Sequence, residues 1–105
     1  MPSYACVIDG GTFLQVPTIV CYEVFRRIAN LSDQRVAATY VEMLKHRDLV
    51  SLDLPLAVLA AQLSTLHKLH MADAVIYATA QSLGVELWTH DTHFQGLPGV
   101  RFVTP

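Results

Sequence analysis

The stretch that most constrains the fold is the C-terminal third, residues 69–103, which reads LHMADAVIYATAQSLGVELWTHDTHFQGLPGVRFV. Apolar residues recur at helical spacing over residues 71–83, and Gly84 follows at a position where helices commonly end with a positive φ. The next apolar run, residues 85–89, lies between this glycine and a polar loop. Such a run predicts a short buried strand. We therefore expect a helix, a strand, a loop and a last strand that ends near Val103.

These elements place two acidic residues where a ligand site is expected. Asp73 lies in the first turn of the helix, and Asp91 lies just past the end of the strand. In α/β sheets, ligands bind in the crevice beyond the carboxyl ends of the strands. Each residue also has a simpler interpretation. Asp73 would favour the positive end of its helix, and Asp91 could bond its own backbone in a turn.

A third carboxylate, Glu23, is the only charge in the apolar run of residues 17–25. A charge on a nearly apolar helix is costly unless it is paired or binds a cation, and an ion pair with Arg27 is the alternative. Clustered carboxylates repel one another unless a cation neutralises them. Oxygen ligands favour Mg²⁺ or Mn²⁺ over zinc. The combination therefore indicates a divalent-cation site.

The rest of the chain predicts helices that alternate with short strands. Expected helices span residues 17–29, 33–46 and 53–66, and expected strands span 12–16 and 49–52. Pro17 suits a first helical turn, and Ser32 or Asp33 can cap the second helix. The stripes expected to face the core are Val36, Ala37, Tyr40, Val41 and Leu44 in one helix and Leu56, Leu59, Ala60, Leu63 and Leu66 in another. This alternation predicts an α/β fold with a mainly parallel sheet.

Composition sets further limits. The 105 residues suffice for one small domain, residues 1–105, and the mean hydropathy of +0.37 is high for a soluble one. We attribute the excess apolar surface to a subunit contact and expect a homodimer.

No apolar run approaches the roughly 18 residues of a membrane span, and the start has no basic region typical of a secretory signal. Cys6 and Cys21 form no CxxC motif. These features together favour a cytoplasmic protein with reduced thiols.

The net charge of −2 gives no electrostatic footprint for strong nucleic-acid binding by the bare protein. A nuclease whose acids hold divalent cations would have the same balance, because the metal supplies the positive charge.

The segment ADAVIYATAQSLGVELWTHDTHFQGLPGV resembles the C-terminal half of a PIN domain, the metal-dependent ribonuclease domain of VapC-type toxins. The resemblance lies in the helix pattern ADA-x-I-x-A-x-A, the T-x-D-x-x-F pattern and the PG before the last strand. Upstream, VPTIVCYEVFRRI is similar to the segment that carries the family's second acidic residue. The resemblance covers residues 13–103 and implies a PIN-like three-layer α/β sandwich.

The resemblance also implies a function. Glu23, Asp73 and Asp91 would hold one or two Mg²⁺ or Mn²⁺ ions for hydrolysis of RNA phosphodiester bonds, without a covalent intermediate. Thr89 would fix the cluster by hydrogen bonding, as the T-x-D pattern implies. A cognate antitoxin would be the protein partner.

The match fails at the beginning of the chain. PIN domains begin with a central strand that ends in an aspartate of the metal site, and YACVID, residues 4–9, imitates it. Only Gly10 and Gly11 separate Asp9 from the next run, which is too short for a parallel crossover. We therefore expect residues 4–8 to be the tail of a helix, with the family's first strand and first helix missing. Asp9 would replace the missing acid only if these residues folded back into the sheet, so nuclease activity is expected to be impaired.

Two rival functions remain open. An inactive PIN remnant would only bind, by dimerising or by sequestering an antitoxin, and would show no stabilisation by Mn²⁺. A receiver-like α/β domain would use an acid cluster for phosphoryl chemistry with a lysine near a strand end. The two lysines, Lys45 and Lys68, do not follow expected strands.

Other catalytic sites find little support. His67 and His70 are three residues apart, as are His90 and His93, and such spacing can bind zinc. Solvated histidines beside the acidic site explain the same pattern. The sequence has no G-x-S-x-G, P-loop or G-x-G-x-x-G motif.

Overall fold

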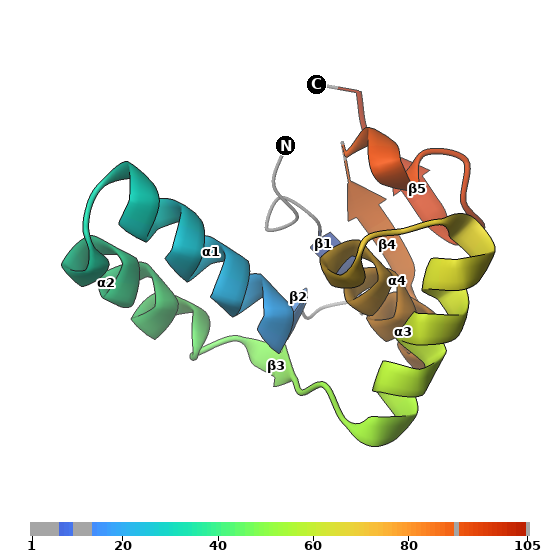
Figure 1. Cartoon of the computed structure of the whole chain (residues 1–105), viewed down its shortest axis with the longest axis horizontal. Helices are drawn as coiled ribbons and strands as arrows, with labels where there is room; N and C mark the ends of the chain where they lie inside the picture. Colours follow the sequence, from blue (N-terminus) through green and yellow to red (C-terminus); the bar gives the residue numbers. More distant parts are fainter. Residues whose placement is uncertain (1–6, 10–13, 90, 105) are drawn as a thin grey trace.

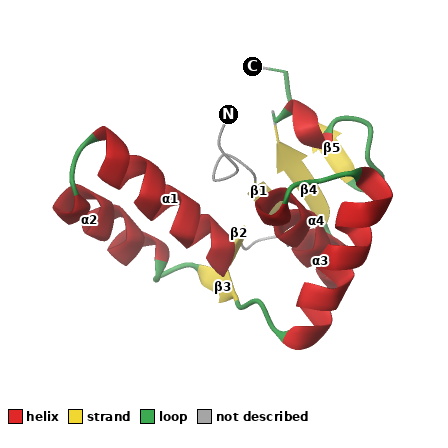
Figure 2. Cartoon of the chain, in the orientation of Figure 1, coloured by secondary structure: helices red, strands yellow, loops and turns green. Residues whose placement is uncertain are grey.

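The structure, a computed structural model, describes residues 7–9, 14–89 and 91–104. The elements, in chain order, are β1 (Val7–Asp9), β2 (Leu14–Pro17), α1 (Thr18–Leu31), α2 (Gln34–Leu44), β3 (Asp48–Val50), α3 (Leu54–His67), α4 (Met71–Leu83), β4 (Glu86–Thr89), the 3₁₀ helix η2 (Thr92–Phe94) and β5 (Val100–Phe102) (Figure 1). Helices and strands alternate along the chain (Figure 2), and the α/β fold expected from the sequence is confirmed.

The five strands form one sheet in the order β3-β2-β1-β4-β5. β2 pairs in parallel with β3, and β4 pairs in parallel with β5, whereas β1 is antiparallel to both β2 and β4. Four strands therefore run in one direction, and the central strand runs against them. The carboxyl ends of those four strands lie at the same edge of the sheet.

We expected residues 4–8 to be the end of a helix. This prediction is wrong for Val7 and Ile8, the two of these residues that the structure describes. Val7, Ile8 and Asp9 form the central strand, and residues 4–6 lie outside the described ranges. The expectation assumed a parallel crossover, which needs a long connection. An antiparallel pair needs only a short one, so Asp9 and Leu14 can be partners across β1 and β2. The central position that we expected to be vacant is thus filled by a strand of opposite direction.

Local signals set the helix ends, as the sequence predicted. The Asp33 carboxylate accepts the backbone N–H of Val36 at 2.9 Å, and the Asp53 carboxylate accepts that of Leu56 at 3.0 Å. Both are N-cap hydrogen bonds. Gly84 ends α4 with a φ of 68°, in the left-handed region where glycine is favoured.

Helix α4 is the centre of the core. Its residues 73–80 are all buried, and it contacts α1, α3, β2 and β4. Tyr77, Phe94, Ile76 and Leu87 are the largest apolar side chains that are fully enclosed. Figure 1 shows α1 and α2 as a helical hairpin to one side, with α3 beside α4 on the other. Among the described helices, none is long and apolar enough to cross a bilayer.

In two helices, some residues that we predicted to face the core are exposed. Val36 and Tyr40 of α2 are 37% and 50% exposed, because α2 packs mainly on α1 and has no second layer beyond it. Leu66, in the last turn of α3, is 71% exposed. Ala37, Leu56 and Ala60 are buried as expected. The remaining members of the stripes, Val41, Leu44, Leu59 and Leu63, are partly buried. Apolar surface therefore remains exposed on both helix pairs.

Candidate metal centre

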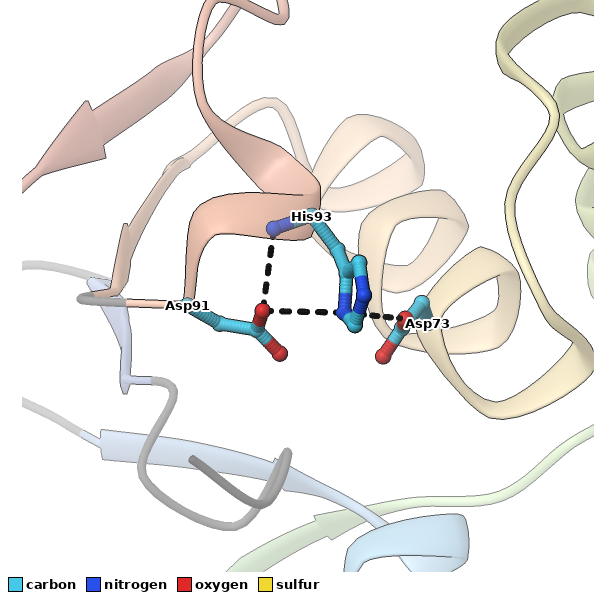
Figure 3. A group of neighbouring side chains, drawn as sticks. All are labelled: Asp73, Asp91 and His93. Carbon is cyan, nitrogen blue, oxygen red and sulfur yellow. Dashed lines mark hydrogen bonds and ion pairs between the residues drawn. The ribbon is translucent and has the colours of Figure 1, made fainter.

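Two buried aspartates come together at the carboxyl edge of the sheet. Asp73 projects from the first turn of α4, and Asp91 follows β4. The two residues are only 8% and 6% exposed. Figure 3 shows the imidazole of His93 between their carboxylates. One ligand atom from each of Asp73, Asp91 and His93 lies within 4.8 Å of the others.

Two hydrogen bonds fix Asp91, one through its backbone and one through its carboxylate. The backbone N–H of Asp91 donates to the Thr89 hydroxyl at 2.9 Å, and Asp91 Oδ1 accepts the backbone N–H of His93 at 2.9 Å. The second bond caps η2, so the turn geometry that we considered as the simple role of Asp91 is present. It orients the side chain toward Asp73 as well. Thr89 is 2% exposed and makes the hydrogen bond to Asp91 within the T-x-D pattern.

His93 is part of the cluster, which the sequence analysis did not predict. Its Nδ1 lies 3.0 Å from Asp91 Oδ1 and 3.6 Å from Asp73 Oδ2. The signal that could have identified it is the short turn after Asp91, since a capped 3₁₀ turn brings the side chain two residues later back beside the cap.

The zinc sites considered from the histidine spacing do not form among the described residues. The His67 ring packs edge-on against Tyr77, with ring centroids 5.6 Å apart, and the His70 ring lies 6.2 Å from that of His93. In the described ranges, Asp73, Asp91 and His93 are the one group of three possible metal ligands. His90 lies outside those ranges.

Glu23 lies near the aspartates but outside this group. Burial and the charge of Asp73 raise the pKa of Glu23, the charge of Asp91 raises it further, and Arg26 lowers it. The Glu23 Oε1 atom is buried and has no hydrogen-bond partner among the described atoms. The alternative ion pair with Arg27 is not among the ion pairs of the described residues. One carboxylate oxygen of Glu23 is therefore buried near the acidic cluster without a hydrogen-bond partner in the described part of the chain.

The surroundings of Asp73 disfavour its ionised form. Burial raises the pKa of Asp73, and so does the charge of Asp91, while His93 and His70 lower it. A net rise means that the imidazoles do not offset burial and repulsion. A cation placed between such carboxylates would relieve both effects.

Asp9 does not join this edge of the sheet. Its backbone is paired with Glu86, at the amino end of β4, whereas Asp91 follows the carboxyl end. The reversed direction of β1 is the reason, because it places the end of β1 opposite the start of β4. We considered Asp9 as a fourth acid for the site. Its backbone lies at the opposite end of β4 from Asp91, so this expectation is not supported.

Comparison with known families and structures gives two matches. The PIN domain family matches residues 8–100. A solved structure, a toxin-antitoxin complex from Klebsiella pneumoniae, is similar with a TM-score of 0.67 and 26% identity, over 83% of this chain and 71% of that chain. None of the curated proteins matches the sequence.

Proposed function

Because the chain belongs to the PIN domain family, we propose that it acts as a metal-dependent endoribonuclease and as the toxin of a toxin–antitoxin pair. The observation that carries this proposal is the convergence of Asp73 and Asp91 beyond the carboxyl end of β4. RNA would be the substrate. An RNA substrate and the free thiol of Cys21 favour a cytoplasmic protein.

The residues of this centre fit a divalent cation such as Mg²⁺ or Mn²⁺. Asp73 and Asp91 provide carboxylate oxygens within 4.8 Å of each other, and the unpartnered Glu23 oxygen is a third candidate ligand. Oxygen donors of this kind are preferred by both ions. When bound, a divalent cation supplies a more acidic water and neutralises charge on a phosphate.

The protein residues would hold and orient this centre. Asp73 and Asp91 would hold the cation through their carboxylates, and Glu23 would be a third acid beside it. Thr89 acts as a positioning residue, because its hydroxyl accepts the backbone N–H of Asp91. The pKa of Asp73 and that of Glu23 are raised, so their ionised forms are disfavoured without a cation. A bound cation would stabilise the ionised form of both acids.

We expect the catalytic rate to be low. The position at which the family carries its first acid is occupied by a strand of opposite direction, and the backbone of Asp9 lies at the far end of β4. Fewer carboxylates attract the cation less strongly and leave more of its coordination to water. Fixed ligand geometry also matters for metal catalysis, and the short central strand offers less of it.

The test is cleavage of a labelled single-stranded RNA with Mn²⁺, Mg²⁺ or EDTA. We expect slow cleavage that requires the metal and falls at least about 100-fold in Asp91→Asn, because removal of a direct ligand disrupts the site. The matched control is Glu86→Gln, which removes an exposed acid that pairs with Arg101 at the other end of β4. Absence of metal-dependent cleavage, together with no thermal stabilisation by Mn²⁺, would favour the inactive binding module instead.

We propose an antitoxin protein as one partner, since the similar Klebsiella structure is a toxin-antitoxin complex. The surface that favours such a partner is an apolar groove of about 550 Å³ between α1 and α2. Its lining residues are Val20, Val24, Ile28, Leu31, Val36, Tyr40, Met43, Leu44 and Arg47. An amphipathic helix inserted along this groove would cover the exposed apolar side chains.

We propose a second copy of the chain as the other partner. Helix α3 has no Asp, Glu, Lys or Arg from Leu54 to His67, yet Leu54 is 76% and Val58 is 49% exposed. A hollow of about 290 Å³ lies between α3 and α4 and is lined on the α3 side by residues that include Ala57 and Ala61. A helix that is apolar on all sides is normally buried on all sides. A homodimer through α3 would satisfy that condition.

A further inference from the structure

We propose that His93 is itself a ligand of the cation, so that the centre is a mixed aspartate–imidazole site that prefers Mn²⁺ to Mg²⁺. This inference rests on the proposed function, because it concerns the same site. It goes beyond the carboxylate set of the family resemblance, which gives no role to His93. The chemistry of the donor atoms and their separations support it.

The separations match those between neighbouring ligands of one ion. His93 Nδ1 lies 3.0 Å from Asp91 Oδ1 and 3.6 Å from Asp73 Oδ2. Two ligands that are each about 2.1 Å from an ion and at right angles are about 3 Å apart. Figure 3 shows the three side chains converging from η2, from the segment before it and from α4. One ligand atom of each side chain lies within 4.8 Å of the others, which is close enough for all three to reach one cation.

The position of His93 is set by its neighbours on both sides. The Asp91 carboxylate accepts the His93 backbone N–H, and the Phe94 backbone N–H donates to the Asp91 carbonyl at 3.1 Å. Phe94 is fully buried, so it anchors η2 in the core. The His93 side chain is 62% exposed, so its ring is accessible from solvent. The backbone that carries the nitrogen donor is therefore held in place before a cation arrives.

The identity of the donors decides between the two candidate ions. Mg²⁺ is bound by oxygen ligands in near-ideal octahedral geometry and retains several waters. Imidazole nitrogen is a softer donor, and affinity for a nitrogen-containing site rises along the first-row metals from Mn²⁺ onward. A neutral imidazole also adds a ligand without adding negative charge to a cluster in which Asp73 and Asp91 already repel each other. Replacing His93 should therefore weaken the binding of Mn²⁺ more than the binding of Mg²⁺.

The competing explanation is a plain ion pair between a protonated His93 and the two aspartates. The imidazolium would then occupy the place of the cation and compete with it. In that case removal of the ring would leave Mn²⁺ binding unchanged or make it tighter. The two explanations thus predict opposite signs for the same substitution.

The direct test is electron spin-echo envelope modulation of Mn²⁺ bound to the full chain, which detects a coordinated ¹⁴N. We expect nitrogen modulation in the native chain and its loss in His93→Ala. His70→Ala is the matched control, because its ring lies 6.2 Å from that of His93 but outside the ligand group. It should retain the modulation. Calorimetric titration should show Mn²⁺ binding weakened roughly tenfold or more in His93→Ala, with Mg²⁺ changed by less than about twofold.

The outcomes separate this inference from the proposed function. Saturable Mn²⁺ binding that is lost in Asp91→Asn but shows no nitrogen modulation would overturn the role of His93 and leave the proposed nuclease site standing. Binding that is equal or tighter in His93→Ala would do the same. Modulation that disappears in His70→Ala and persists in His93→Ala would also overturn it. Failure of the native chain to bind Mn²⁺ at all would overturn both.

Discussion

The negative charge of Asp73, which the candidate site uses, lowers the stability of the fold. The residue lies in the first turn of α4, where the helix dipole favours a negative charge, but it is followed by a run of buried residues. Burial and the neighbouring Asp91 charge raise the pKa of Asp73 despite that dipole. An ionised Asp73 therefore costs free energy in the folded, metal-free protein.

This cost predicts that Asp73→Asn raises the melting temperature of the metal-free protein at pH 7. A raised folded-state pKa means that folding is favoured below the unfolded pKa of about 3.9 and loses stability as pH rises through the folded value. The penalty is present at pH 7, and the amide removes it. Each kcal/mol relieved corresponds to roughly 4–8 °C for a domain of this size. Calorimetry from pH 8 to pH 3 should show the gain shrinking as the pH falls through the folded-state pKa and disappearing below about pH 4.

The control for this prediction is Glu42→Gln. Glu42 is exposed, and its hydrogen bond and ion pair with Lys45 lower its pKa, so its removal should not stabilise the protein. Excess Mn²⁺ should stabilise the native chain and leave Asp73→Asn unchanged. An Asn variant that is less stable than the native chain at pH 7 without metal would show that the Asp73 charge is not unfavourable in the fold.

The elements differ in how far the sequence determines them. Helix α4 was predicted at 71–83 and occurs there, because its periodicity and Gly84 act within a few residues. Strand β1 was not predicted, because its pairing with β2 and β4 is decided by residues distant in sequence. The same distinction holds for the site. Asp73 and Asp91 follow from their places at element ends, whereas His93 meets Asp73 only after α4 and η2 have packed.

The hairpin of α1 and α2 carries the surface that we assign to the antitoxin. Tyr40 and Met43 are 50% and 62% exposed, although both lie on the side of α2 that lines the groove. Only Arg47 is charged among the lining residues, so an acidic group on an otherwise apolar helix would complement it.

We predict that Met43→Glu weakens antitoxin binding by roughly tenfold or more, because a carboxylate would be buried in an apolar interface without a partner. The measurement is co-purification with a co-expressed candidate antitoxin, followed by titration of the separated proteins. Leu66→Glu is the control, since Leu66 is also exposed, at 71%, but lies on α3. If both variants hold the partner as tightly as the native chain, the groove is not its docking site.

At the scale of the whole molecule, the distribution of charge decides which surface is suited to a homodimer interface. A two-fold interface brings each patch against itself, so any charge near the axis faces its own image. The exposed face of α3 around Leu54 and Val58 has no Asp, Glu, Lys or Arg within the helix, whereas the α1–α2 groove contains Arg47. Interface cores of homodimers are apolar and depleted in charge. The α3 face is therefore the better candidate for self-association.

We predict that the native chain is a dimer at micromolar concentration and that Val58→Glu makes it a monomer. The substitution places two like charges near the two-fold axis, and Val58 is exposed in the single chain, so the fold should tolerate it. Multi-angle light scattering after gel filtration gives the mass, and circular dichroism verifies that the helices are retained. Met43→Glu, on the opposite helix pair, should remain dimeric. A monomeric native chain would exclude self-association at this concentration, and a dimeric Val58→Glu variant would move the interface away from α3.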